Sequence, residues 1–160
     1  MKSPCRLFIL FVLTAISTSA ITQKQDLALK HIDDNTGVYA DAAMQIWNFA
    51  ELGYQETQSS ALLQKILKEA GFKITSGVAG MPTAFIAEYG SGKPIIGILG
   101  EFDALPGLSQ AAVPEEKPII PGEPGHGCGH HLFGVGSAAS AITVAEWLSK
   151  TKTQGTIRFY

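Results

Sequence analysis

The chain has 160 residues, of which 46% are hydrophobic and 16% are charged, and its formal net charge is −2. This length suits one domain with a core of its own. The mildly acidic balance comes without any cluster of lysine and arginine. It therefore argues against binding to nucleic acid or to an anionic membrane surface.

The first twenty residues are typical of a secretory signal peptide. Lys2 and Arg6 give a basic start, residues 7–16 are almost all apolar, and small residues follow at 18–20. The apolar run is too short to span a bilayer comfortably. We expect a signal peptide over residues 1–20, a mature domain over 21–160, a secreted or periplasmic location and no membrane contact after cleavage. A retained N-terminal anchor is the alternative.

Cleavage would leave 10 basic against 14 acidic residues, a formal charge of −4, with Cys128 as the one remaining cysteine. A secreted chain with a single cysteine has no internal disulfide. An unpaired thiol in an oxidising compartment suggests a function such as metal ligation.

Apolar spacing predicts helices in the first half of the mature chain. One is expected over residues 25–52, with an interruption at 35–37 that would divide it in two. A clearer amphipathic helix is expected over 56–70, where Gly71 has the position of a C-terminal capping glycine.

The second half is expected to hold most of the strands. Residues 94–100 form a continuous apolar run, which is typical of a strand buried on both faces. An edge strand at 72–76, a strand at 83–89, a small-residue helix at 132–149 and a strand from 155 complete the pattern.

Acidic residues follow the buried strand. Sites in open α/β sheets lie at the carboxyl ends of strands, so Asp103 is a candidate for site chemistry. The alternative, an acid that only caps a turn, has equal weight from position alone. Residues 107–125 then form a long proline-rich connection, which we interpret as an active-site loop.

The segment Gly125–His131 places three histidines and a cysteine within seven residues, separated by glycines. Thiolate and imidazole ligands on a tight turn before a helix favour a divalent metal site. Two alternatives stay open on chemistry alone. These side chains could be buried structural residues, or Cys128 could be a thiolate nucleophile activated by a histidine.

Two blocks, residues 100–107 and 125–130, together resemble the M20 metallopeptidases. The branch that contains aminobenzoyl-glutamate and N-acyl-amino-acid hydrolases is the most similar, and residues 50–56 and 77–84 extend the resemblance. It implies the N-terminal part of an α/β/α-sandwich catalytic domain that binds two divalent ions, zinc or manganese. Cys128 and His130 would be metal ligands, and Asp103 would orient a ligand and support catalysis.

Two positions depart from the family pattern. Glu101 stands where other branches have a ligand histidine, and we assign it no metal. His131 stands where this branch more often has Asn or Asp.

The resemblance implies a metal-dependent amidohydrolase that cleaves the amide bond of a small N-acyl or aminobenzoyl amino acid or a dipeptide, with a homodimer as a candidate assembly of the full-length protein. In this family the general-base glutamate, further ligands and a lid domain come after the strand that ends at Tyr160. We therefore expect the chain to be part of a longer enzyme. One alternative is a non-catalytic fragment or remnant that lacks this glutamate, and another is a Cys-His thiol hydrolase.

Overall fold

The computed structural model describes the backbone of residues 4–160 and the side chains of residues 26–160. Three helices, a short 3-10 helix and four strands follow one another along these residues. They are α1 (Pro4–Phe49), α2 (Thr57–Glu69), β1 (Lys73–Ser76), η1 (Val78–Gly80), β2 (Phe85–Ser91), β3 (Ile95–Ile98), α3 (His130–Thr151) and β4 (Gly155–Phe159).

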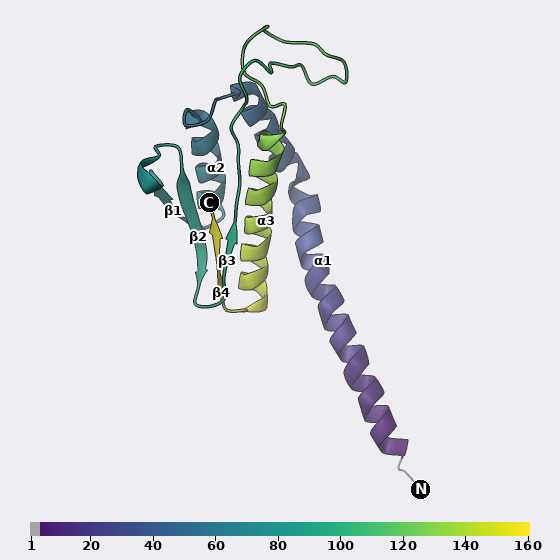
Figure 1. The fold of residues 1–160 in the computed structure, drawn as a ribbon. Helices are drawn as coiled ribbons and strands as arrows, with labels where there is room; N and C mark the ends of the chain where they lie inside the picture. The colour runs from purple at the N-terminus through teal and green to yellow at the C-terminus, as the bar shows by residue number, and fades with distance from the viewer. Residues whose placement is uncertain (1–3) are drawn as a thin grey trace.

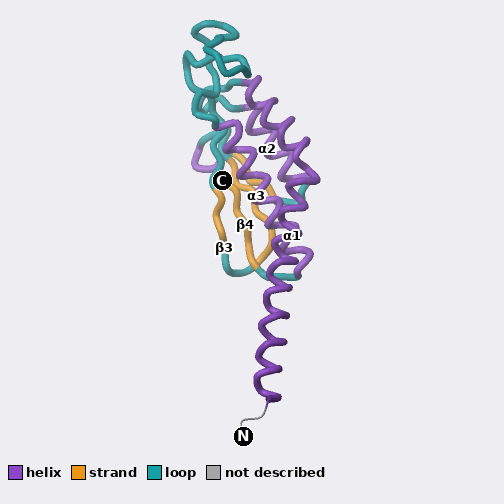
Figure 2. Tube along the Cα trace, turned by 90° about the vertical axis from the view of Figure 1, so that its right-hand side faces the viewer, coloured by secondary structure: helices purple, strands orange, loops and turns teal. Residues whose placement is uncertain are grey.

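The four strands form one mixed sheet in the order β1-β2-β4-β3. Strand β2 pairs antiparallel with β1 and β4, whereas β3 runs parallel to β4. The three helices lie behind the sheet in the view of Figure 1, and the side view in Figure 2 places them together on one face. The expected α/β fold class is confirmed.

The core lies between the helices and the covered face of the sheet. Ile46 of α1, Leu63 and Leu67 of α2, and Phe159 of β4 are fully buried there. Helix α3 contributes buried alanines at 138, 139, 141 and 145, so its backbone comes close to the sheet, as its small residues predict. Among the described residues, α3 is the helix long and apolar enough to cross a membrane, and half of its most apolar stretch is buried in the molecule.

Two predictions about the elements are wrong. Helix α1 continues through residues 35–37, where the Asn35 amide donates to the His31 carbonyl and the Thr36 hydroxyl donates to that of Ile32. These side chains bond back to the helix, so they do not end it.

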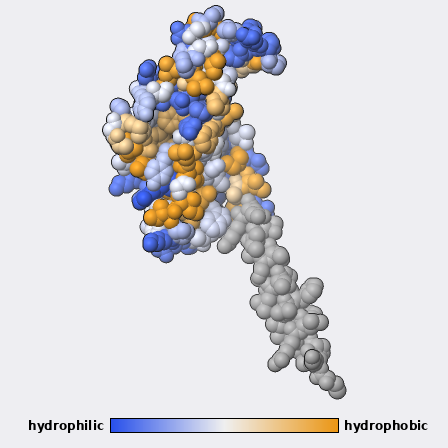
Figure 3. All heavy atoms as spheres, in the orientation of Figure 1, coloured by the Kyte–Doolittle hydropathy of each residue, from blue (hydrophilic) through white to orange (hydrophobic). Residues whose placement is uncertain are grey.

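Strand β3 is not buried on both faces. In the part of the chain that the structure describes it pairs only with β4, and the helices cover only one face of the sheet. Ile95 and Ile96 are therefore about half exposed, at 49% and 51%. Figure 3 shows apolar residues on this open face of the sheet.

The predicted signal peptide falls on residues 1–20. Residues 1–3 lie outside the described residues, and the structure describes no side chains for the others. The signal peptide and the domain start at residue 21 stay predictions.

The side chain of Glu51 caps helix α2 from outside the helix. Its carboxylate accepts hydrogen bonds from the backbone N–H groups of Gln58 and Ser59, both at 2.9 Å, and from the hydroxyls of Thr57 and Ser59. Partial burial raises the pKa of Glu51, but these hydrogen bonds outweigh it and leave the pKa below its usual value. The carboxylate thus satisfies N–H groups that have no partner inside the helix.

We predict that Glu51→Gln lowers the free energy of unfolding by about 1 kcal/mol at pH 7, the usual effect of losing a helix cap. Folding lowers the pKa of Glu51 below its value in the unfolded chain, which is near 4.5. The stabilisation by Glu51 is therefore fully present when the pH is above the unfolded pKa, and it is lost as the pH falls through the folded pKa. Urea unfolding of both proteins at pH 7 and pH 4 should show the difference shrinking at pH 4.

The matched control is Glu69→Gln at the other end of α2, where an exposed carboxylate lies 4.0 Å from Lys65. Such a pair contributes little, so this change should stay within about 0.5 kcal/mol. Equal effects of the two substitutions would contradict the capping role of Glu51.

Candidate metal centre

Backbone pairing brings the acidic segment and the histidine turn together. Leu105 and Gly125 exchange two hydrogen bonds, at 2.9 and 3.0 Å, although they are twenty positions apart in the sequence. A side chain at position 125 would meet the carbonyl oxygen of Leu108 at 1.9 Å, so this approach requires glycine. Ala104 also donates its N–H to the carbonyl of Glu51 at 2.7 Å. The two residues that directly follow Asp103 are therefore both held by backbone hydrogen bonds, which fixes where Asp103 lies.

The imidazole of His130, the first residue of α3, lies between two carboxylates. Its Nδ1 is 2.8 Å from Oδ1 of Asp103, and its Nε2 is 3.1 Å from Oε2 of Glu101. The ligand atoms of the three residues all lie within 4.8 Å of one another. The imidazole and Asp103 are partly buried, while Glu101 is more exposed.

This donor set fits a divalent cation. When Nδ1–H donates to Asp103, the tautomer of His130 is fixed and the lone pair of Nε2 faces outward, the usual arrangement of a metal-binding histidine and its carboxylate partner. The Glu101 oxygen lies beside that lone pair. Imidazole nitrogen and carboxylate oxygen are ligands that zinc and manganese accept.

The structure thus brings together Asp103 and His130, two of the three predicted site residues. It adds Glu101, to which the sequence analysis assigned no metal. The spacing of Glu101 and Asp103 could have indicated this. Residues two positions apart in an extended segment point to the same face, so these two carboxylates are expected on one side of the chain. Helix α3 comes close to this segment because residue 134 is a glycine, whose added Cβ would lie 2.8 Å from the Glu101 carbonyl oxygen.

Cys128, the third predicted site residue, is exposed on the turn before α3 and is not part of the group formed by Glu101, Asp103 and His130. A hydrogen bond from the N–H of Gly129 to the carbonyl of His126 closes this turn at 3.1 Å. Ligation by Cys128 stays a prediction.

The other two histidines of the turn are buried in a separate cluster with Trp47. His126 and His131 are 4% and 6% exposed, their ring centres lie 4.9 Å apart, and Nε2–H of His126 donates to the Ile46 carbonyl at 3.0 Å. Burial lowers the pKa of His126 and lowers that of His131 to about 4, with His126 adding to the second shift. Both rings are therefore neutral at pH 7 and join the turn to α1. The contact with Trp47, 79 residues before His126, had no signal in the sequence.

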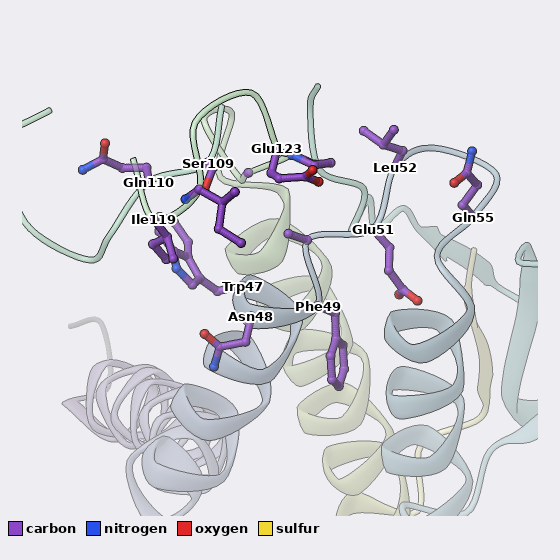
Figure 4. A pocket seen from close by; sticks show the side chains of 14 residues that line it. Trp47, Asn48, Phe49, Glu51, Leu52, Gln55, Ser109, Gln110, Ile119 and Glu123 are labelled. Carbon is purple, nitrogen blue, oxygen red and sulfur yellow. The ribbon is translucent and has the colours of Figure 1, made fainter. Parts of the chain in front are cut away.

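Two grooves lie near this region. The larger, of about 660 Å3, runs between the end of α1 and the 108–124 loop, and Trp47, Phe49, Gln110 and Ile119 line it (Figure 4). Neither Asp103 nor His130 belongs to its lining. The second, of about 450 Å3, is lined by Glu101 and Asp103 themselves together with mostly apolar side chains. The second groove is thus the one that adjoins the candidate centre.

The sequence is similar to one of the subunits of p-aminobenzoyl-glutamate hydrolase from Escherichia coli (strain K12), with 48% identity over 123 residues. The match covers 76% of this chain but only 26% of that relative, so the chain spans about a quarter of its length. No family model matches the sequence.

Two solved structures have similar folds. A Staphylococcus aureus (methicillin-resistant) protein described as an aminohydrolase matches with a TM-score of 0.68 and 21% identity, over 85% of this chain and 34% of that one. The Bacillus subtilis YXEP protein, described as a dinuclear metal-binding peptidase of the M20 family, matches with a TM-score of 0.55 and 26% identity, over 78% of this chain and 35% of that one. The sequence of this chain is thus similar to about a quarter of one p-aminobenzoyl-glutamate hydrolase subunit. Its fold is similar to about a third of an aminohydrolase and of an M20 peptidase that binds two metal ions.

Proposed function

We propose that the chain is part of a metal-dependent amidohydrolase that cleaves the amide bond of a small N-acyl or aminobenzoyl amino acid or a dipeptide. The observation that carries this proposal is the His130 imidazole held between the carboxylates of Asp103 and Glu101. The 48% identity to a p-aminobenzoyl-glutamate hydrolase subunit supports the reaction class.

Each residue of the centre would have a distinct role. Asp103 accepts the Nδ1 proton and fixes the imidazole, His130 presents Nε2 as a ligand, and Glu101 adds an anionic oxygen beside it. We propose Cys128 as a further, thiolate ligand. Divalent ions at such a site, zinc or manganese, polarise an amide carbonyl and lower the pKa of water.

The general base has no assigned residue in this chain. The family resemblance implies a general-base glutamate that no residue of this chain is assigned to, and the chain spans about a quarter to a third of the relatives' length. A non-catalytic fragment or remnant is the second candidate function. We also propose a secreted or periplasmic location. The full-length protein would assemble with a second subunit or as a homodimer, since the relative is itself named as a subunit.

We predict that the 160-residue chain binds zinc and that Asp103→Asn weakens this binding about tenfold or more, as expected for the loss of a carboxylate that orients a histidine ligand. His130→Ala should weaken it further. Calorimetric titration with zinc measures both effects. The matched control is His31→Gln, since His31 also pairs with a carboxylate, that of Glu146. An equal loss in the control would contradict the assignment.

Hydrolysis can be tested in a chimera in which this chain replaces the matching segment of the E. coli relative. We expect it to release p-aminobenzoate from p-aminobenzoyl-glutamate, to lose this activity in chelator, and to regain it with zinc or manganese. Activity that persists unchanged in excess chelator would exclude the metal mechanism. Turnover by the repurified 160-residue chain alone would exclude the non-catalytic alternative.

Substitutions of Cys128 in the same chimera separate a ligand from a nucleophile. Cys128→Ser should lower metal content and activity together, because a hydroxyl stays protonated near neutral pH and lacks the charge of a thiolate. Cys128→Asp should restore part of both, since a carboxylate is anionic. Loss of turnover in both variants at unchanged metal content would indicate a nucleophilic cysteine instead.

A further inference from the structure

A groove of about 590 Å3, called here the α2 groove, lies between α2, β1 and the segment that leads into β2. Lys65 and Lys68 line it, and no aspartate or glutamate does. The groove beside the candidate centre and the groove beside the end of α1 are different, because carboxylates line both and no lysine or arginine does. The α2 groove is therefore suited to a partner that carries negative charge.

The two lysines of the α2 groove are available to such a partner. Both are exposed and lie three positions apart on α2, so their side chains are neighbours on one side of the helix. The ammonium of Lys65 lies 4.0 Å from the carboxylate of Glu69, and that of Lys68 has no ion pair or hydrogen bond among residues 26–160. Apolar side chains line the groove as well, those of Ala61, Ile74 and Pro82. An occupant with neighbouring acids and an apolar part would match this lining.

Residues 108–124, called here the arm, project from the molecule. Figures 1 and 2 both show this loop extending past the ends of the helices. The arm is ordered by its own hydrogen bonds, since the N–H of Ala111 donates to the Lys117 carbonyl at 2.9 Å. The Gln110 amide donates to the Glu115 carbonyl at 2.8 Å and accepts from the N–H of Lys117 at 2.9 Å. A segment held in one conformation loses less entropy on binding, so the tip of the arm is suited to enter a groove.

The tip of the arm, residues 113–116, has the composition that the α2 groove would hold. Val113 is 38% exposed, Pro114 follows it, and Glu115 and Glu116 are both exposed. Neither carboxylate has an ion pair or hydrogen bond among the residues whose side chains the structure describes. Two acids beside two apolar residues thus complement two lysines beside an apolar lining. Because the arm extends away from α2 of its own chain, the complementary groove would belong to a second copy (Figure 1).

We propose that two copies of this chain associate by exchanging arms, with the tip of each arm in the α2 groove of the other copy. The two acids of the tip pair with the two lysines of the groove, and the apolar residues of the tip cover its apolar lining. The contact occurs twice about a two-fold axis, the commonest symmetry of protein dimers. Exposed ion pairs contribute little singly, so the dimer is weak and sensitive to salt. This inference gives an interface to the homodimer of the proposed function.

Sedimentation equilibrium of the 160-residue chain at low and high salt tests the inference. We expect a dimer whose dissociation constant rises with salt. Two charge reversals, Lys65→Glu with Lys68→Glu and Glu115→Lys with Glu116→Lys, should each raise this constant about tenfold or more, because like charges then face one another. An equal mixture of the two reversed proteins should restore the dimer, since the arm of each is then attracted by the groove of the other.

The matched control is Asp33→Lys with Asp34→Lys. These two acids are also adjacent and exposed, but they lie on α1, outside both the arm and the α2 groove. The control has the same change in charge as the reversed arm, and it should leave the dissociation constant unchanged. Circular dichroism should show the native fold in all of these proteins, as expected for substitutions of exposed side chains.

Three results would overturn the inference. They are a monomeric wild-type chain, a dimer that neither reversal weakens, and a mixture of the two folded reversed proteins that stays monomeric. If a monomeric wild-type chain binds a glutamate-rich peptide and the reversed groove does not, the groove belongs instead to an acidic segment of another protein. None of these measurements requires metal or turnover. The dimer can therefore be confirmed while the amidohydrolase proposal fails, and the reverse.

Discussion

The candidate centre depends on one backbone contact, the pair of hydrogen bonds between Leu105 and Gly125. This pairing joins the segment that leaves β3 to the turn that begins α3, so residues far apart in sequence face one another. It is possible only because residue 125 has no side chain to meet the Leu108 carbonyl. The position of Asp103 relative to His130 is thus set by the backbone rather than by flexible side chains.

The chemistry follows from that placement. An imidazole with a carboxylate at each nitrogen is electrostatically suited to a cation. The carboxylate of Asp103 is the more buried of the two, and that of Glu101 is more open to solvent. The remaining two histidines of the turn do not join this group. They are buried against Trp47 and hold the turn on α1. The three histidines lie within six residues of one another in the sequence but have different surroundings in the fold. His130 belongs to the polar site, whereas His126 and His131 form a structural contact.

Local patterns predicted most of the elements correctly. The amphipathic spacing before Gly71 predicted α2, and the small residues after His131 predicted a helix close to the sheet, because these signals depend on neighbours in the chain. The continuity of α1 depended on how Asn35 and Thr36 orient their side chains, which composition does not reveal. The exposure of β3 depended on which strands lie beside it. At the site, the position of Asp103 after a strand and the family resemblance at His130 made these two residues candidates. That Glu101 lies beside them depends on the close approach of α3 at Gly134, which the sequence does not reveal.

The central claim is that His130, with Asp103 behind it and Glu101 beside it, forms part of a metal centre. X-ray absorption spectroscopy of the zinc-loaded chain tests this most directly. We predict an imidazole contribution and a nitrogen or oxygen shell at about 2.0 Å that both change in His130→Ala, with a sulfur shell at about 2.3 Å if Cys128 is also a ligand. Bound zinc whose spectrum shows no imidazole, or is the same in His130→Ala, would contradict it.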